Sequence, residues 1–231
     1  MPIRLRSVFT ATLIGANTVL HVIPLFALTL FKAVLPCAAV RRACNPWLTG
    51  VAESWIGCNS RMIGWFTHTR VIVSGEVPLS RDGRYLVLAN HQSWVDIPVL
   101  QKVFNRRIPL LRFFLKSQLF WVPLLGLAWW ALDFPFMHRH SRDDIARRPE
   151  LAGRDIAATR RACERFRDIP VSVMNFVEGK RFTEARQSAQ DSPYRHLRRP
   201  RAGGVAFVLD AMGDGLRWSL GVPVVCRGGR P

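Results

Sequence analysis

The chain has 231 residues, enough for one α/β domain with a substantial core and an additional N-terminal segment. Its 33 Lys and Arg residues against 16 Asp and Glu residues give a formal net charge of +17, which predicts an anionic partner. The zinc-finger, basic-zipper and aromatic–basic signatures of nucleic-acid-binding proteins are absent, so we expect anionic membrane lipid and no nucleic acid. The five cysteines form no Cys-x-x-Cys pair, which indicates free thiols and no metal site.

The N-terminal region contains an uncharged run, 7–31, which is long enough to cross the core of a bilayer. It is too long for the apolar part of a signal peptide, and no small-residue cleavage site follows it cleanly. Asn17, His21 and Pro24 interrupt the run. The sequence therefore leaves two interpretations open, a helix that spans the membrane and a helix that lies in one leaflet.

A basic, proline-containing connection is expected over residues 36–50, and a second amphipathic helix over 47–67. The apolar residues of this helix recur every three or four positions. Its tryptophans could anchor at the lipid interface or pack on the rest of the protein. Residues 1–67 are thus predicted to form an N-terminal membrane-anchoring segment, and residues 68–231 a second domain.

The second domain alternates between strand-like and helix-like segments. Strands are predicted at 71–75, 85–89, 171–176 and 222–226, and helices at 97–104, within 141–167 and at 205–212. An apolar segment, 117–132, is interpreted as core and as the wall of an apolar channel. The alternation predicts an α/β fold with a mixed or largely parallel sheet flanked by helices, preceded by an N-terminal membrane helix or helices.

The most informative segment, 90–96 (NHQSWVD), directly follows the predicted strand at 85–89. In open α/β folds, reacting groups collect at the ends of such strands. His91 is a candidate general base, and Asp96 would orient its ring and stabilise the imidazolium. Alternatively, His91 merely caps a helix. Asn90 and Ser93 could position the histidine or the substrate, or serve as turn and cap residues, whereas Trp94 is interpreted as a packing residue.

A second polar segment, 176–183 (FVEGKRFT), follows the predicted strand at 171–176. Gly179 permits close approach of the backbone, and Arg181 offers a planar fork suited to phosphate. The alternative is a surface charge pair formed by Glu178 and Arg181. No nucleophile-elbow pattern is present, which favours direct transfer between two bound substrates over a covalent enzyme intermediate.

These segments resemble two motifs of the PlsC-type glycerolipid acyltransferases, His-x4-Asp at 90–96 and Glu-Gly-x-Arg at 176–183. Between them, 134–139 (FPFMHR) resembles the arginine-bearing second block of that family. Near the end, 222–225 (VPVV) resembles its apolar fourth block. The blocks occur in the family's order over roughly 70–226, and the resemblance is closest to a bacterial branch with an N-terminal membrane segment.

The resemblance implies transfer of a fatty acyl group from acyl-CoA or acyl-carrier protein to the free hydroxyl of lysophosphatidic acid, giving phosphatidic acid in phospholipid synthesis. It implies catalytic roles for His91 and Asp96, and no cofactor or metal. Substrate-binding roles are expected for Glu178, Gly179, Arg181, Arg139 and Lys116, with Arg142 as a competitor of Arg139. For Lys116 the partner is the phosphate of either the acceptor or the donor.

The cytosolic acyl donors and the basic residues after the uncharged run imply a bacterial inner-membrane protein whose catalytic domain faces the cytoplasm. Members of the family generally continue well beyond the fourth block, so the acyltransferase domain at 68–231 is expected to be truncated at its C-terminus. Two alternatives remain: the same chemistry on another lysolipid, or a catalytically silent, basic membrane-binding protein.

Overall fold

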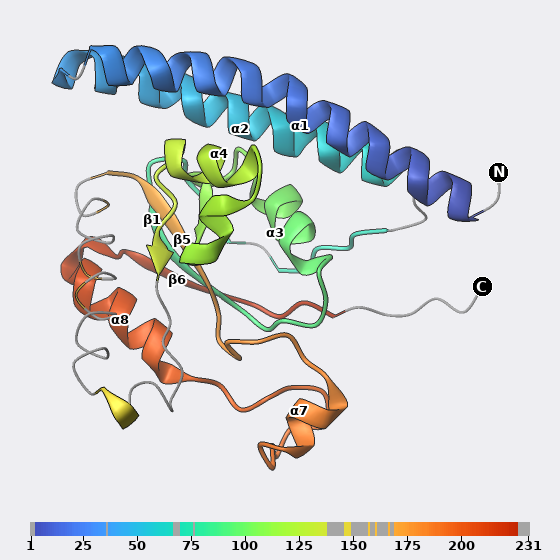
Figure 1. The fold of residues 1–231 in the computed structure, drawn as a ribbon. Coiled ribbons are helices and arrows are strands. Elements are labelled where there is room, and N and C mark those ends of the chain that lie inside the picture. The colour runs from blue at the N-terminus through green and yellow to red at the C-terminus, as the bar shows by residue number, and fades with distance from the viewer. Residues whose placement is uncertain are drawn as a thin grey trace.

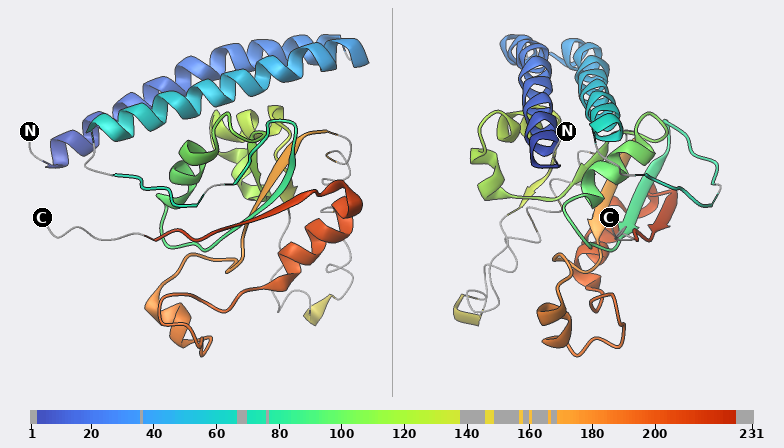
Figure 2. Two further views of the ribbon diagram at one scale, coloured as in Figure 1. Left: turned by 180° about the vertical axis from the view of Figure 1, so that it is seen from behind. Right: turned by 90° about the vertical axis from the view of Figure 1, so that its right-hand side faces the viewer.

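Two long helices lie side by side along one side of an α/β domain (Figures 1 and 2). The computed structural model describes residues 3–35, 37–66, 70–75, 77–137 and 169–225, together with 146–148, 157, 160 and 166. The layers, from the helix pair inward, are the two long helices, a group of short helices, a parallel sheet and a final helix on the far face of the sheet (Figure 1).

The first layer is a hairpin of α1 (Ile3–Val34) and α2 (Ala38–Phe66). The uncharged run therefore lies within one continuous helix of 32 residues, about 48 Å long at 1.5 Å per residue. The predicted connection at 36–50 is wrong over most of its length, because α2 begins at Ala38 and continues through Pro46. Packing of α2 along α1 outweighs the helix-breaking tendency of that proline.

Polar side chains join the two helices where their apolar surfaces meet. Asn17 Nδ2 donates to Asn59 Oδ1 at 2.8 Å, and His21 Nε2 lies 3.1 Å from Ser54 Oγ. We call these four residues the helix seam. Asn17 and His21, which interrupt the apolar run in the sequence, thus bind α2. Such interhelical hydrogen bonds hold helices together in an apolar environment, where few other partners are available.

The outward surface of the helix pair is strongly apolar. Ile23 and Leu30 on α1, and Trp47 and Trp65 on α2, are each more than 60% exposed. Among the described residues, one helix is long and apolar enough to cross a membrane, over Leu5–Val34, with a mean hydropathy of 1.8. Its most apolar stretch is only 11% buried inside the protein, unlike a core helix of a water-soluble domain.

The sheet contains four parallel strands in the order β2-β5-β1-β6. Their bounds are Arg84–Ala89 for β1, Leu111–Phe113 for β2, Val171–Phe176 for β5 and Trp218–Val222 for β6. The strands predicted at 85–89 and 171–176 are confirmed, and they pair directly as the two central strands. The expected α/β fold with a largely parallel sheet is also confirmed.

Alternate residues of β1 pack on opposite sides of the sheet. Val87 packs in the core cluster that contains residues of α1, α2, α3 (Asp96–Phe104) and α4 (Leu125–Ala131). Leu86 packs in a second cluster with Val208 and Met212 of α8 (Ala202–Met212). Because both faces of the sheet are covered, its strands are short and apolar, as expected for parallel sheets.

Shorter elements connect these layers: β3 (Leu115–Lys116), a 3₁₀ turn η1 (Ser117–Trp121), β4 (Phe136–Met137), α7 (Glu184–Ser188) and a 3₁₀ turn η2 (Gly213–Gly215). β3 pairs in parallel with β4 to form a separate two-stranded sheet. The predicted helices at 97–104 and 205–212 are confirmed as α3 and α8.

Two predicted strands differ from the structure. Residues 71–75 form no strand, and the side chains of Ile72 and Val73 are exposed, so their β-branched character alone does not recruit them to the sheet. The last strand is β6 and ends at Val222, where the prediction began. The amphipathic helix expected within 141–167 lies largely outside the described residues.

Candidate active site

The two polar segments meet at the carboxyl edge of the sheet. β1 and β5 are adjacent and parallel, so the residues that follow Ala89 and Phe176 leave the sheet at the same edge. Val177 N donates to Ala89 O at 3.0 Å, and Phe182 N donates to His91 O at 2.7 Å. The topology therefore brings together loops that are more than 80 residues apart in the sequence, as expected at the edge where α/β sheets bind ligands.

The first loop holds His91 and Asp96 as a hydrogen-bonded pair. His91 Nδ1 lies 2.9 Å from Asp96 Oδ2. The same carboxylate oxygen accepts the backbone N–H groups of Gln92 at 2.6 Å and Ser93 at 2.8 Å. Asp96 is fully buried at the first turn of α3, so its carboxylate is held by these donors and by the helix around it. Because Asp96 Oδ2 accepts a hydrogen bond at Nδ1, the neutral His91 ring carries its hydrogen on Nδ1.

On the other side of the His91 ring, Nε2 has no hydrogen-bond partner among the described residues, and the side chain is 15% exposed. The imidazole stacks on Phe176, the last residue of β5, with ring centroids 4.0 Å apart and an interplanar angle of 14°. The carboxylate and the aromatic face therefore hold the ring while Nε2 remains available to a substrate.

The second loop places Glu178 in the interior behind His91. Glu178 is 1% exposed, and neither carboxylate oxygen has a hydrogen-bond partner among the described residues. Burial raises the pKa of Glu178, which outweighs the opposing effects of the neighbouring backbone N–H groups of Arg198 and His91 and of the Arg198 charge. These groups compensate the buried carboxylate only in part, so its burial costs stability and is not explained by packing.

Arg198 supports this loop from behind and has no counterpart among the predicted site residues. Its Nη1 donates to Glu178 O at 3.3 Å and to Lys180 O at 3.2 Å, and the residue is only 4% exposed. Burial lowers its pKa. No local pattern indicates this role, because Arg198 is one of several arginines in a basic segment.

Gly179 permits the tight turn between Glu178 and the exposed residues that follow. Its φ is +68°, a left-handed conformation that side chains disfavour. A Cβ at this position would also lie 3.3 Å from Cδ of Arg201. Gly179 therefore shapes the loop, as its place in the motif predicted, and lets the chain of Arg201 approach closely.

The two loops also meet through Arg181 and Trp94. The guanidinium of Arg181 lies over the indole of Trp94, with its central carbon 4.9 Å from the ring centroid. Trp94 is 73% exposed, so its interpretation as a packing residue is wrong. The possibility that Glu178 and Arg181 form a surface charge pair is not supported either, because Glu178 is buried and no ion pair joins them in the described chain.

The remaining predicted binding residues are less closely connected. Lys116 is exposed at the end of β3, three residues beyond the carboxyl end of β2. No hydrogen bond or ion pair joins it to the residues of the two loops in the part of the chain that the structure describes. Arg139 and its competitor Arg142 lie outside the described residues.

Asn90, left open between a substrate contact and a turn residue, binds the chain that follows β6. Its Nδ2 donates to Val224 O at 2.8 Å, and Val224 N donates to its Oδ1 at 2.6 Å. The side chain thereby continues the pairing of β1 with the segment that resembles the fourth block. Asn90 thus fixes the start of the loop, and Ser93 contributes its backbone N–H to Asp96.

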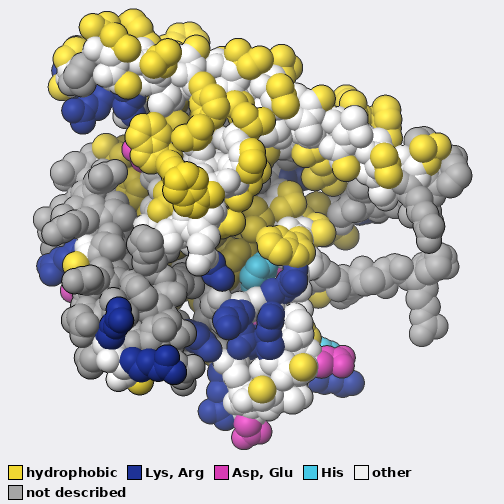
Figure 3. All heavy atoms as spheres, viewed as in Figure 1, with side chains coloured by type: hydrophobic (Ala, Val, Ile, Leu, Met, Phe, Trp, Pro, Cys, Tyr) yellow, Lys and Arg dark blue, Asp and Glu magenta, His cyan; other side chains and the backbone are white. Residues whose placement is uncertain are grey.

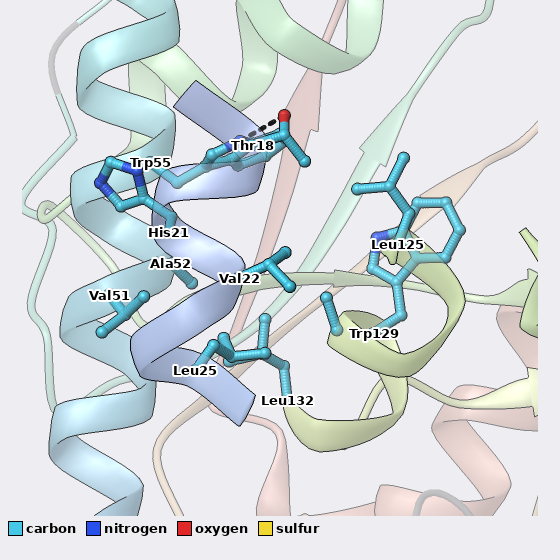
Figure 4. A pocket seen from close by; sticks show the side chains of 11 residues that line it. Thr18, His21, Val22, Leu25, Val51, Ala52, Trp55, Leu125, Trp129 and Leu132 are labelled. Atoms are coloured by element: carbon cyan, nitrogen blue, oxygen red, sulfur yellow. Dashed lines mark hydrogen bonds between the residues drawn. The ribbon is translucent and has the colours of Figure 1, made fainter. Parts of the chain in front are cut away.

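An apolar cavity of about 50 Å³ lies elsewhere, between the helix pair and α4 (Figure 4). Residues such as Val22, Leu25 and Trp129 line it, and Trp55 Nε1 donates to Thr18 Oγ1 at its rim. None of its lining residues belongs to the two loops, so it is not the reaction centre. Among the described residues, no group of three His, Cys, Asp or Glu residues could hold a metal ion.

Comparisons with known proteins agree on the class of protein. A family model described as Acyltransferase matches residues 70–227. Lysocardiolipin acyltransferase 1 of Mus musculus is 22% identical over 193 residues, covering 79% of this chain and 49% of the mouse protein. The chain thus spans about half the length of this curated relative.

A solved structure shares the fold. The crystal structure of the 1-acyl-sn-glycerophosphate (LPA) acyltransferase PlsC from Thermotoga maritima matches with a TM-score of 0.59 and 14% sequence identity. The match covers 96% of this chain and 84% of that chain, so it includes the helix pair as well as the sheet.

Proposed function

Because the chain belongs to the Acyltransferase family, we propose that it transfers a fatty acyl group from acyl-CoA or acyl-carrier protein to the free hydroxyl of lysophosphatidic acid, giving phosphatidic acid. The single observation that carries this proposal is the His91–Asp96 pair, with its free Nε2, beside the loop of Glu178 and Arg181. A base and a cationic group suited to phosphate then stand at one edge of the sheet.

The proposed reaction uses His91 as the general base. The acceptor hydroxyl gives its proton to Nε2 while its oxygen attacks the carbonyl carbon of the thioester. The C–S bond then breaks, and the imidazolium returns the proton to the leaving thiolate. Asp96 stabilises the imidazolium between these two steps. A thioester is already reactive toward an activated alcohol, so the mechanism requires neither a metal nor another cofactor.

The proposed acceptor site extends from His91 toward Arg181. The guanidinium of Arg181 has no hydrogen-bond partner among the described residues, so its N–H groups can bind a phosphate bidentately. Gly179 gives the loop its shape, and Arg139 and Lys116 are proposed as further phosphate contacts. Glu178 is proposed to bind the glycerol part of the acceptor once a shift of its loop exposes the carboxylate, whose oxygens can accept a hydroxyl hydrogen bond.

The proposed location is the bacterial inner membrane, with the catalytic domain on the cytoplasmic side. Figure 3 shows apolar side chains spread over the helix pair and the neighbouring short helices, and Lys and Arg side chains gathered below them. Such a distribution suits a helix pair in lipid and a basic domain at an anionic surface. We propose that anionic lipid, lysophosphatidic acid and the acyl donor are the partners.

The test is a transfer assay with membranes that contain the full-length protein. Labelled acyl-CoA and acyl-carrier protein are compared as donors, and lysophosphatidic acid is compared with monolysocardiolipin and lysophosphatidylcholine as acceptors. We expect kcat/KM to be highest for lysophosphatidic acid. A preference for monolysocardiolipin would support the second candidate acceptor, which the name of the mouse relative suggests. Absence of transfer with every pair would contradict the proposal and leave a silent membrane-binding protein.

The membrane location is tested separately by washing. Alkaline carbonate and high salt should leave the full-length protein in the membrane, because its attachment depends on the apolar surface of α1 rather than on screened charges alone. A protein that begins after α1 should be released more readily by salt. Complete release of the full-length protein by high salt would contradict the proposed location.

A further inference from the structure

Trp94 and Arg181 form a contact between the two loops that the proposed reaction does not by itself require. The guanidinium carbon of Arg181 lies 4.9 Å from the centroid of the Trp94 ring, within the range of a cation–π interaction. Trp94 is 73% exposed and stands three residues after the proposed base.

The backbones on both sides of this contact are fixed. Phe182 N donates to His91 O at 2.7 Å, and Arg181 O accepts from Arg186 Nη1 at 3.2 Å. On the other side, Ser93 N donates to the buried carboxylate of Asp96 at 2.8 Å. The long Arg181 side chain is therefore the part of this contact that keeps most conformational freedom, and the face of the indole restricts its motion.

Stacking constrains the guanidinium without using its hydrogen bonds. The ring contacts the flat face of the group, whereas its N–H bonds point outward in the plane. In the described chain those N–H groups have no acceptor, so they stay available to a ligand. An arginine held in this way loses less conformational entropy when it binds a phosphate.

We propose that Trp94 is a positioning residue that holds Arg181 ready for the phosphate of the acceptor. The same short loop then carries the base and the platform for the phosphate-binding group, so the spacing between the hydroxyl and the phosphate of the acceptor is set by residues 91–96. This inference deepens the proposed function and relies on it for the identity of the acceptor.

The experiment compares Trp94→Leu and Trp94→Phe with the full-length wild type in detergent micelles. Leucine keeps an apolar side chain but removes the π face, whereas phenylalanine keeps a weaker one. We expect Trp94→Leu to raise the apparent KM for lysophosphatidic acid about three- to tenfold, with kcat and the KM of the acyl donor almost unchanged. Trp94→Phe should restore part of the loss. Trp218→Ala, which removes a half-exposed indole at the start of β6, is the matched control.

A double-mutant cycle with Arg181→Ala separates positioning from other roles of the indole. If Trp94 acts through Arg181, Trp94→Leu should cause no further rise in the KM for lysophosphatidic acid in the Arg181→Ala background. An equal rise in both backgrounds would overturn the proposal. So would a Trp94→Leu defect that affects both substrates equally and follows a loss of binding to anionic vesicles, because Trp94 would then be a lipid anchor.

Equilibrium binding of lysophosphatidic acid without an acyl donor distinguishes this inference from the proposed function. Weaker binding by Trp94→Leu, absent in the Arg181→Ala background, would support the positioning role even if no acyl transfer occurred. Conversely, normal transfer and normal binding by a folded Trp94→Leu protein would overturn the positioning role and leave the proposed reaction intact.

Discussion

The helix pair and the carboxyl edge of the sheet each contain a partly buried histidine, and the two differ in how many of their ring nitrogens are occupied. In the helix pair, His21 Nδ1 lies 2.9 Å from Asn17 O and Nε2 lies 3.1 Å from Ser54 Oγ. At the sheet edge, Nδ1 of His91 bonds Asp96, and Nε2 has no partner in the described part of the chain. Both nitrogens of His21 bind groups within the helix pair, whereas the proposed reaction assigns Nε2 of His91 to the acceptor hydroxyl.

The same difference extends to the neighbouring polar groups. Asn17 and Asn59 of the helix seam bind each other, as buried amides generally must. At the sheet edge, the carboxylate of Glu178 and the guanidinium of Arg181 have no hydrogen-bonding partner among the described residues. Paired polar groups stabilise the protein, whereas groups left unpaired in an ordered loop cost stability and are available for binding.

Replacement of each histidine by alanine tests this comparison most strongly. His91→Ala should lower kcat about 10²- to 10⁴-fold, because the acceptor hydroxyl loses its base. His21→Ala should lower thermal stability through the lost seam contact, with only a small change in kcat. The measurement is acyl transfer alongside thermal unfolding in detergent. Near-normal turnover by folded His91→Ala protein would falsify the proposed mechanism.

A smaller effect is expected at Asp96, which acts on the substrate only through His91. Asp96→Asn should also lower kcat severely, although by no more than His91→Ala does, because the carboxylate orients the base. The amide can misplace the ring and its tautomer, and it also loses the charge that stabilises the imidazolium. The pH dependence of kcat should change with it. An unchanged pH profile together with normal kcat would show that Asp96 serves only the start of α3.

The residues of this candidate site were easier to predict from the sequence than the contacts between them. His91 and Asp96 follow an apolar strand at a spacing that a short loop can close, so a local pattern was enough to find them. Phe176 and Arg198 were missed, because their roles depend on the pairing of β1 with β5 and on the path of the chain after α7. Long-range pairing leaves no local signature.

The fold shows the same limit. Apolar runs at 85–89 and 171–176 identified the central strands, but a similar run at 71–75 is exposed and unpaired. What separates them is a place in the sheet rather than composition, since β propensity reflects packing against neighbours. Likewise, α2 was predicted to begin near residue 47 and begins at Ala38, because its contact with α1 extends the helix.

At the proposed phosphate-binding end of the site, the prediction concerns the planar guanidinium of Arg181. Arg181→Lys keeps the charge but loses bidentate geometry and stacking, so it should raise the KM for lysophosphatidic acid about tenfold. Lys180→Gln, a change of charge at the next position, should have a much smaller effect because that side chain is exposed. Kinetics with both substrates varied provide the test. A rise confined to the KM of the acyl donor would reassign Arg181 to the phosphates of the donor.

In the helix seam, loss of a paired amide should reduce stability without affecting substrate binding. Asn59→Ala removes the acceptor at 2.8 Å from Asn17 and should lower the free energy of unfolding by about 1 kcal/mol. Ser60→Ala is the matched control, because that hydroxyl bonds only Ile56 O within α2. Unfolding in mixed detergent would measure both variants. Equal stability of the two would mean that the seam does not join the helices as inferred.

The smallest effect is expected at Glu178, where substitution should raise the stability of the protein rather than lower it. Its pKa is raised in the folded protein by burial, so its contribution to stability is full below the ordinary value of 4.5 and is lost as the pH rises through the folded value. Glu178→Gln removes the buried charge and should therefore melt above the wild type by a margin that is larger at pH 8 than at pH 5. Glu184→Gln, at an exposed carboxylate in α7, is the matched control for the loss of a carboxylate outside the interior. If Glu178→Gln instead destabilises the protein more at pH 8, the carboxylate stabilises the fold. The contrast between paired groups in the helix seam and unpaired groups at the sheet edge would then not hold for Glu178.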